Sequence, residues 1–212
     1  VSDADFTIMP DFAVTSPNGG EVWDVSSSRD ITWTTTGSCT NVKLEYSVNS
    51  GSTYTDIVAS TPNTETYAWT VPDNLSISCK VRVSDVDNVN AMDATDGLFK
   101  IRGALTLTAP NGFESWDVAD VENITWTRFG SIANVKLEYS TDSGSTYPNL
   151  IIASTDASTE TYAWTIPDNL STTIRVKVTD TADSSVFDMS NADFTIKGAV
   201  TLMYPNGGEQ FQ

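Results

Sequence analysis

The stretch PNGGEVW at residues 17–23 returns as PNGFESW at residues 110–116 and starts a third time as PNGGEQF at residues 205–211. The first interval is 93 residues (17 to 110) and the second is 95 residues (110 to 205). Five further words recur between these markers in the same order: ITWT, NVKLEYS, SGSTY, TETYAWT and PDNLS. Self-similarity at a fixed period is the signature of a repeat protein. The sequence therefore contains two complete copies of one unit.

Both ends of the sequence match parts of this unit. DADFTI at residues 3–8 corresponds to NADFTI at residues 191–196, which closes the second copy. Residues 1–10 are predicted to be the closing strand of a preceding repeat, and residues 199–212 the opening strand of a following one. The complete repeats are predicted at residues 11–103 and 104–198. Each partial strand has an apolar face that a lone strand cannot bury, so we expect neighbouring repeats or chains to cover it, as in a filament.

Composition excludes several classes of function. The formal net charge of −17 and pI near 4.1 oppose binding to nucleic acid or to anionic lipid, because both need clustered Lys and Arg. No apolar run approaches the length of a membrane span, so we expect no membrane insertion. The sequence has no His, which removes Ser–His–Asp triads and histidine metal sites. Its two cysteines are too few for a thiolate zinc site.

The pattern of apolar residues predicts an all-β fold. No segment has the apolar spacing of an amphipathic helix, whereas alternation with a period of two recurs every few residues. Val42, Leu44 and Tyr46 alternate with Lys43 and Glu45, so each strand has one wet face and two antiparallel sheets must close over one core. Seven strands are predicted in each repeat, at residues 12–16, 30–35, 41–47, 54–59, 66–71, 78–84 and 98–102, and at residues 105–108, 123–127, 134–140, 150–153, 161–166, 173–179 and 193–197.

Seven antiparallel strands in two sheets are typical of an immunoglobulin-like sandwich. The words ITWT, VKLEYS with SGSTY, YAWTVP, KVRVSD and a final F-x-I resemble the immunoglobulin-like domain of the yeast cell-wall-synthesis, serine/threonine-rich, GPI-anchored membrane family, and the strand pattern is similar to fibronectin type III. The resemblance implies tandem sandwiches, arranged in line, on an extracellular or cell-surface protein. It implies no catalytic residue.

Tryptophan is the residue type that would carry sugar binding in such a fold. Four tryptophans alternate with other apolar residues and are predicted to lie in the core: Trp33, Trp69, Trp126 and Trp164. Trp23 and Trp116 follow the glycines of the first strand, where core or junction packing competes with exposure to a glycan. Sugar binding would require both of these rings to be exposed.

Acidic residues crowd the loop before the last strand of each repeat, at Asp85, Asp87, Asp93 and Asp96, and at Asp180, Asp183, Asp188 and Asp193. Several carboxylates on one loop could hold Ca²⁺, although the spacing fits no EF-hand. We assign no metal or cofactor ligand and keep Ca²⁺ as an open alternative. The nearby S-T-D-S-G-S-T-Y, residues 140–147, matches the Asp-box of sialidase propellers, and we interpret it as a hairpin turn stapled by side chains.

Cys39 and Cys79 replace isoleucines of the second repeat, Ile132 and Ile174. Their joint appearance suggests a disulfide, which an extracellular setting would permit. In a sandwich, however, they would lie at opposite ends, beyond the roughly 7 Å Cα limit. We therefore predict two separate buried thiols.

Two further sets of residues have competing interpretations. Asn74, Asn123 and Asn169 satisfy the N-glycosylation sequon, which a Ser/Thr-rich sequence also meets by chance. Nine of the eleven basic residues lie on three predicted strands per repeat and should face outward on one sheet: Lys43, Lys80, Arg82, Lys100, Arg102, Lys136, Arg175, Lys177 and Lys197. They either form a solvated ladder paired with Glu45 and Glu138, or a positive face that meets the negative ends of neighbouring chains.

The leading hypothesis is a non-enzymatic structural segment of a long extracellular tandem-repeat protein, such as a stalk, fibre or adhesin, because tandem copies extend reach. The alternative is a carbohydrate-binding or accessory region of a secreted enzyme that acts on polysaccharides. An enzyme in this stretch would need a pair of carboxylates, and Glu21 with Asp24 is the candidate pair. We predict no catalytic residue.

Overall fold

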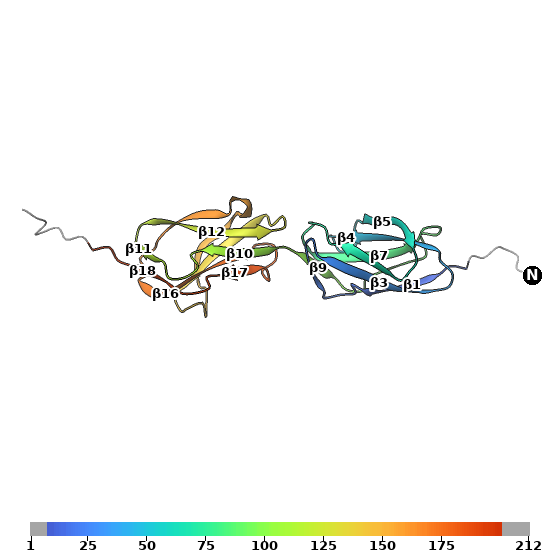
Figure 1. The fold of residues 1–212 in the computed structure, drawn as a ribbon, viewed down its shortest axis with the longest axis horizontal. Coiled ribbons are helices and arrows are strands. Elements are labelled where there is room, and N and C mark those ends of the chain that lie inside the picture. Colours follow the sequence, from blue (N-terminus) through green and yellow to red (C-terminus); the bar gives the residue numbers. More distant parts are fainter. Residues whose placement is uncertain (1–7, 201–212) are drawn as a thin grey trace, which may run out of the picture. The chain divides into compact units, whose positions relative to one another are not determined.

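The computed structural model describes residues 8–200 and divides into two compact units between Ala104 and Leu105. The fold is all-β, as predicted (Figure 1). The described residues contain one helical turn, the 3₁₀ turn η1 (Ala157–Thr159). The predicted strand in residues 1–10 falls largely, and the one in residues 199–212 almost wholly, outside the described residues. What covers these strands therefore stays a prediction.

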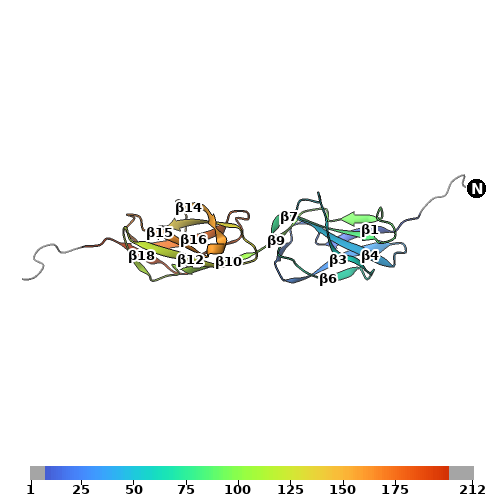
Figure 2. The ribbon, with the colours of Figure 1, turned by 90° about the horizontal axis from the view of Figure 1, so that it is seen from above.

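The first unit consists of β1 (Asp11–Ser16), β2 (Val22–Asp24), β3 (Ser28–Thr36), β4 (Asn41–Ser47), β5 (Thr55–Pro62), β6 (Thr66–Thr70), β7 (Ser76–Asp85), β8 (Met92–Ala94) and β9 (Phe99–Arg102). One sheet has the order β1-β3-β6, and the other has the order β2-β9-β7-β4-β5 with β8 added beside β7. The two sheets face each other as the layers of a sandwich (Figure 2). Strand β2 pairs with β9 in parallel, while the other strand pairs are antiparallel.

The second unit repeats this order with β10 (Ala104–Ala109), β11 (Ser115–Asp117), β12 (Val121–Phe129), β13 (Asn134–Ser140), β14 (Asn149–Asp156), β15 (Thr161–Thr165), β16 (Ser171–Asp180), β17 (Phe187–Met189) and β18 (Phe194–Lys197). Its sheets are β10-β12-β15 and β11-β18-β16-β13-β14, with β17 beside β16. The first and last strands of the larger sheet, β11 and β18, are again parallel.

All seven predicted strands are present in each unit, but the count of seven was wrong. Two three-residue strands were missed in each unit, β2 and β8 in the first and β11 and β17 in the second. Three residues are too few for a period of two to be recognised. The partners of β2 and β11 lie far away in the sequence, whereas β8 and β17 pair with the strands that precede them, β7 and β16.

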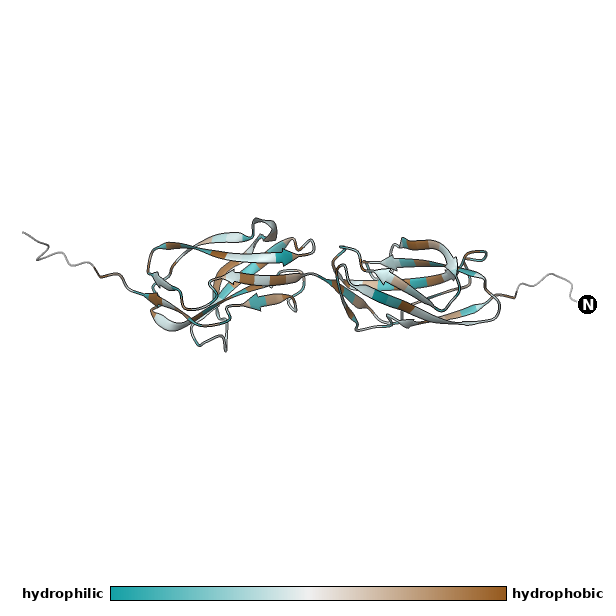
Figure 3. Ribbon diagram, viewed as in Figure 1, coloured by the Kyte–Doolittle hydropathy of each residue, from teal (hydrophilic) through white to brown (hydrophobic). Residues whose placement is uncertain are grey.

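Hydrophobic and hydrophilic residues are interspersed along the strands (Figure 3), and the side chains expected in the core are buried. Val42, Leu44 and Tyr46 line the core of the first unit, and Trp33 and Trp126 are only 2 % and 1 % exposed. Trp69 and Trp164 are also buried. These four tryptophans are confirmed as core residues.

Trp23 and Trp116 are buried as well, at 5 % and 9 % exposure. The ring of Trp23 lies 5.9 Å from Trp69 and 5.1 Å from Phe99 between centroids, in tilted and edge-on geometries that aromatic pairs favour. Trp116 has the corresponding contacts with Trp164 and Phe194. Each unit is therefore built around the same aromatic cluster.

Candidate functional site

The PNGGE word forms a clamp between two loops of one unit. In the first unit, the Glu21 carboxylate accepts hydrogen bonds from the amides of Asn18 and Gly19, both at 2.7 Å. The Asn18 side chain then accepts one from the amide of Asp96 at 2.7 Å. Glu114 and Asn111 repeat these bonds at 2.7–2.8 Å. Both words begin with a cis X-Pro peptide bond, at Pro17 and Pro110.

The glycine of this clamp is required by close backbone approach. A Cβ on Gly19 would lie 2.9 Å from the Cα of Gly97, and a Cβ on Gly112 would lie 2.5 Å from the Cβ of Ala192. Both glycines also have positive φ, at +133° and +125°. The first glycine of the repeated PNGGE word is thus required by the fold.

The S-T-D-S-G-S-T-Y word is a hairpin turn, as interpreted from sequence. Asp142 accepts hydrogen bonds from the Ser140 hydroxyl at 2.6 Å, and from the amide and hydroxyl of Thr146 at 2.9 and 2.7 Å. Ser143 and Gly144 have φ of +57° and +82°, the two consecutive positive values of a tight hairpin turn. In the first unit Asn49 occupies the position of Asp142. It accepts from the Ser47 hydroxyl and the Thr53 amide, and its own side-chain amide donates to the Thr53 hydroxyl.

This difference predicts a dependence on pH in the second unit alone. The hydroxyls of Ser140 and Thr146 hold the pKa of Asp142 at about 2, below its ordinary value of 3.8. A depressed carboxyl pKa stabilises the folded state above the unfolded pKa, and this contribution is lost as pH falls from about 4 toward 2. We expect amide exchange in the Asp142 turn to accelerate over this range, measured by hydrogen exchange and normalised to intrinsic rates.

The Asn49 turn of the first unit is the built-in control, because an amide does not titrate. The substitution Asp142→Asn should keep the turn and reduce its acid sensitivity to the part that comes from Asp193, which accepts from the Ser143 hydroxyl at 2.8 Å and also has a lowered pKa. Equal acceleration in both turns would contradict the assignment.

The PDNLS turns hold a tyrosine in place. The Asn74 side-chain amide donates to the Tyr46 hydroxyl, and Asn169 donates to the Tyr139 hydroxyl, each at 2.5 Å. Two of the three sequon asparagines therefore have a structural role inside their own unit, while Asn123 is an exposed residue of β12. Glycosylation of the three sites stays untested.

The aspartates of the acidic loops have separate hydrogen-bond partners. Asp93 accepts the amide of Val14 on β1 at 2.7 Å, and Asp188 accepts the amide of Leu107 on β10 at the same distance. These two carboxylates cap an edge amide of the smaller sheet. Asp193 is held by Arg175 at 2.6 Å. Within residues 8–200 no three acidic, His or Cys side chains are grouped so that they could hold a metal, so the Ca²⁺ alternative has no cluster to support it.

The candidate carboxylate pair is also divided. Glu21 belongs to the PNGGE clamp, whereas Asp24 accepts a hydrogen bond from Arg102 at 2.8 Å. Both oxygens of Glu21 are occupied by backbone amides. The two carboxylates therefore have different structural partners.

The two cysteines are separate thiols, as predicted. Cys79 lies in the core on β7, and burial raises its pKa. The prediction that both are buried was wrong for Cys39, which is half-buried in the loop between β3 and β4. Its Sγ donates to the Asn41 carbonyl at 3.2 Å. Partial burial and, as a smaller cause, the neighbouring Asp85 carboxylate raise the pKa of this thiol. The corresponding Ile132 is fully buried.

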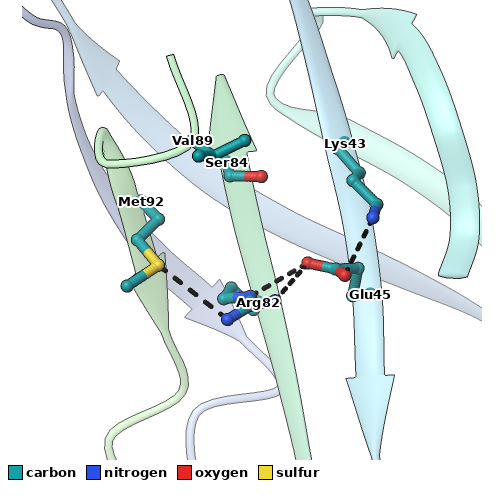
Figure 4. A pocket seen from close by; sticks show the side chains of 6 residues that line it. All are labelled: Lys43, Glu45, Arg82, Ser84, Val89 and Met92. Atoms are coloured by element: carbon teal, nitrogen blue, oxygen red, sulfur yellow. Dashed lines mark hydrogen bonds and ion pairs between the residues drawn. The ribbon is translucent and has the colours of Figure 1, made fainter. Parts of the chain in front are cut away.

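The predicted basic ladder is present on the outer face of the larger sheet, and in the first unit it is paired with acids. Glu45 is only 6 % exposed and lies between two cations (Figure 4). Arg82 donates to it from Nε and Nη2 at 2.9 and 2.7 Å. Lys43 contacts Glu45 at 2.9 Å and Asp56 at 2.7 Å. This supports the paired interpretation over a free positive face.

A pocket of about 250 Å³ lies beside this network, lined by Lys43, Glu45, Arg82, Ser84, Val89 and Met92 (Figure 4). Val89 and Met92 were not predicted, because they belong to the loop and short strand that the sequence pattern did not reveal. The Arg82 guanidinium also stacks on the Tyr54 ring, 4.1 Å from its centroid. The charged groups of this pocket are therefore already engaged with one another.

All six tryptophan rings are buried, so none of them is exposed to bind a sugar. The exposed aromatic rings include Phe113, at 91 % exposure, and Phe187, at 43 %. Phe113 has a φ of +72° at the position of Gly20 in the first unit. Within residues 8–200 no helix is long and apolar enough to span a membrane.

The similarities of this chain to known proteins are confined to solved structures of low sequence identity. No protein-family model and no curated protein matches the chain. Among solved structures, it is similar to the fibronectin(III)-like modules of Clostridium thermocellum CbhA, with 18% identity, a TM-score of 0.34, and coverage of 95% of this chain and 100% of that one. It is also similar to the N-terminal four Ig domains of Dscam1 isoform 8.4, with 8% identity, a TM-score of 0.47, and coverage of 92% and 48%. The structural neighbours are thus fibronectin III-like and immunoglobulin domains.

Proposed function

We propose that this chain is a non-enzymatic structural segment of a long extracellular tandem-repeat protein, such as a surface stalk, fibre or adhesin. The observation that carries the proposal is the use of the repeated words. Their polar side chains, Glu21, Asn74 and Ser47 with their second-unit counterparts, bond within their own unit. The polar side chains that the two copies share therefore stabilise the fold of each unit. A shared catalytic or binding site would instead present identical side chains to solvent.

The parallel pairing of an early strand with the last strand of each unit supports a mechanical role. In each unit an early strand and the last strand are parallel neighbours, β2 with β9 and β11 with β18. Force applied at the two ends of a unit would slide such strands past each other. The backbone hydrogen bonds between the two strands would then be loaded together, in shear. The bonds of the second pair include Val118 N to Lys197 O and Thr195 N to Glu114 O, both at 2.9 Å.

A filament of repeats or chains, and a location outside the cell, are parts of this proposal. They rest on the tandem repeats. In such a filament the partners are neighbouring copies of the same unit.

Pulling the whole chain by its ends in a single-molecule force experiment tests the proposal. We expect two separate unfolding events, each lengthening the chain by about 300 Å, because each residue spans at most about 3.6 Å when extended. A chain that lengthens smoothly without two force peaks would contradict the proposed role.

A further inference from the structure

The outer face of the larger sheet differs between the two units at matched positions. In the first unit, ladder neighbours across the sheet are Asp56, Glu45, Arg82 and Ala94. In the second unit the corresponding row is Leu150, Glu138, Lys177 and Met189. The second unit has thus lost an acid, exchanged Arg for Lys, and gained two apolar side chains on one face.

In the part of the chain that the structure describes, the ammonium group of Lys177 has no acidic partner. Residues 8–200 place no carboxylate oxygen within 4.0 Å of it, because Glu138, its neighbour across the ladder, is paired with Lys136 at 2.9 Å. Its Nζ lies instead over two aromatic rings, 4.3 Å from the centroid of Phe187 and 5.6 Å from that of Tyr147. The side chain is therefore positioned by aromatic rings and not by a carboxylate.

Apolar surface flanks this cation. Phe187 is 43 % exposed and Leu150 is 59 % exposed. Neighbouring strands lie about 4.8 Å apart, so Leu150 on β14 is roughly 10 Å from Lys177 on β16. Tyr147, Leu150, Lys177 and Phe187 together form what we call the Lys177 face.

We propose that the Lys177 face binds a carboxylated sugar residue, with Lys177 pairing with the carboxylate and the sugar ring lying against the exposed side chain of Phe187. An ammonium at the edge of aromatic and aliphatic surface complements a ring that carries one negative charge and apolar C–H edges. The proposal adds a binding site to the structural role, and its failure would leave that role unaffected.

The size of the face favours a sugar over a protein partner. A stable protein interface involves about 20–30 residues on each side, whereas this face has four. The net charge of −17 opposes any anion, but at an ionic strength of 0.15 M that repulsion acts over only about 8 Å. Inside that distance the neighbouring acid Glu138 has its charge offset by Lys136 at 2.9 Å, so the contact with Lys177 determines binding at close range.

The test is an NMR titration of the whole chain with a trisaccharide of galacturonate at 0.15 M salt. We expect amide shifts near Lys177, Phe187 and Leu150, with a millimolar Kd, and none at Arg82 and Met92 of the first unit. A neutral trisaccharide of the same length should bind at least fivefold more weakly. A peptide of four glutamates, which carries charge without the ring, should do the same.

Three variants separate the contributions. Lys177→Gln should weaken binding at least fivefold, and Phe187→Met, which introduces the residue found at this position in the first unit, at least threefold. Lys197→Gln removes the same charge elsewhere in the second unit and should leave the Kd within twofold. The amide spectrum of each variant reports whether it is folded.

Three outcomes would overturn the proposal. These are no shifts at 20 mM trisaccharide, equal shifts in both units, or equal affinity of the Lys177→Gln variant when its spectrum remains folded. Equal or tighter binding of the glutamate peptide would also overturn it, because charge alone would then explain the interaction.

Discussion

Replacing Trp126 by alanine is expected to lower the free energy of unfolding of the second unit by about 3–5 kcal/mol. The ring is 1 % exposed, so its removal leaves a cavity that the surrounding strands cannot fill. Its Nε1 also donates to the buried carbonyl of Ala157 at 3.1 Å, and the variant would leave that acceptor only the longer bond from the Glu160 amide at 3.3 Å. Amide hydrogen exchange, read separately for peptides of each unit, measures the change.

The first unit of the same chain is the internal control and should keep its protection. Trp126→Phe retains most of the buried volume and should cost clearly less than the alanine variant. A loss below about 1 kcal/mol in Trp126→Ala would mean that the ring is not part of the core, since filled core positions cost more than this.

The second large effect is expected at Glu114, where alanine should destabilise the second unit by about 2–3 kcal/mol. The carboxylate accepts two amide hydrogen bonds, from Asn111 at 2.7 Å and Gly112 at 2.8 Å. Truncation leaves both amides of the clamp without this acceptor. Chemical denaturation followed by hydrogen exchange of the second unit provides the measurement.

Glu114→Gln is the matched control, because one amide oxygen still accepts while the charge is lost. We expect it to fall between the wild type and Glu114→Ala. If Glu114→Ala changed stability by less than about 0.5 kcal/mol, the repeated glutamate would need an explanation outside the fold.

The sequence was sufficient to predict the elements whose signal is local. Alternation placed Trp33 and Leu44 in the core, and the S-G pair of residues 143–144 indicated a hairpin turn. These features depend on neighbouring residues, so a single sequence records them. Burial of Trp23 and Trp116 was less certain from sequence because their strands are only three residues long.

Features that depend on pairing between distant strands could not be predicted. The near-complete burial of Glu45 requires Arg82 and Lys43 to close over it from both sides, which only the register of β7 against β4 determines. The unpaired Lys177 was predicted as one member of a uniform basic ladder. Its difference from Arg82 arises because a lysine reaches Phe187, a residue on a strand that the alternation did not reveal.

The most direct test of the structural role is the force at which the second unit unfolds when Val118 is changed to proline or to alanine. Val118 N donates to Lys197 O across the parallel pair β11 and β18, and proline removes this donor whereas alanine keeps it. The account predicts that Val118→Pro lowers the rupture force of one of the two unfolding events, while Val118→Ala leaves both close to the wild type. Equal rupture forces in the proline and alanine variants would contradict it.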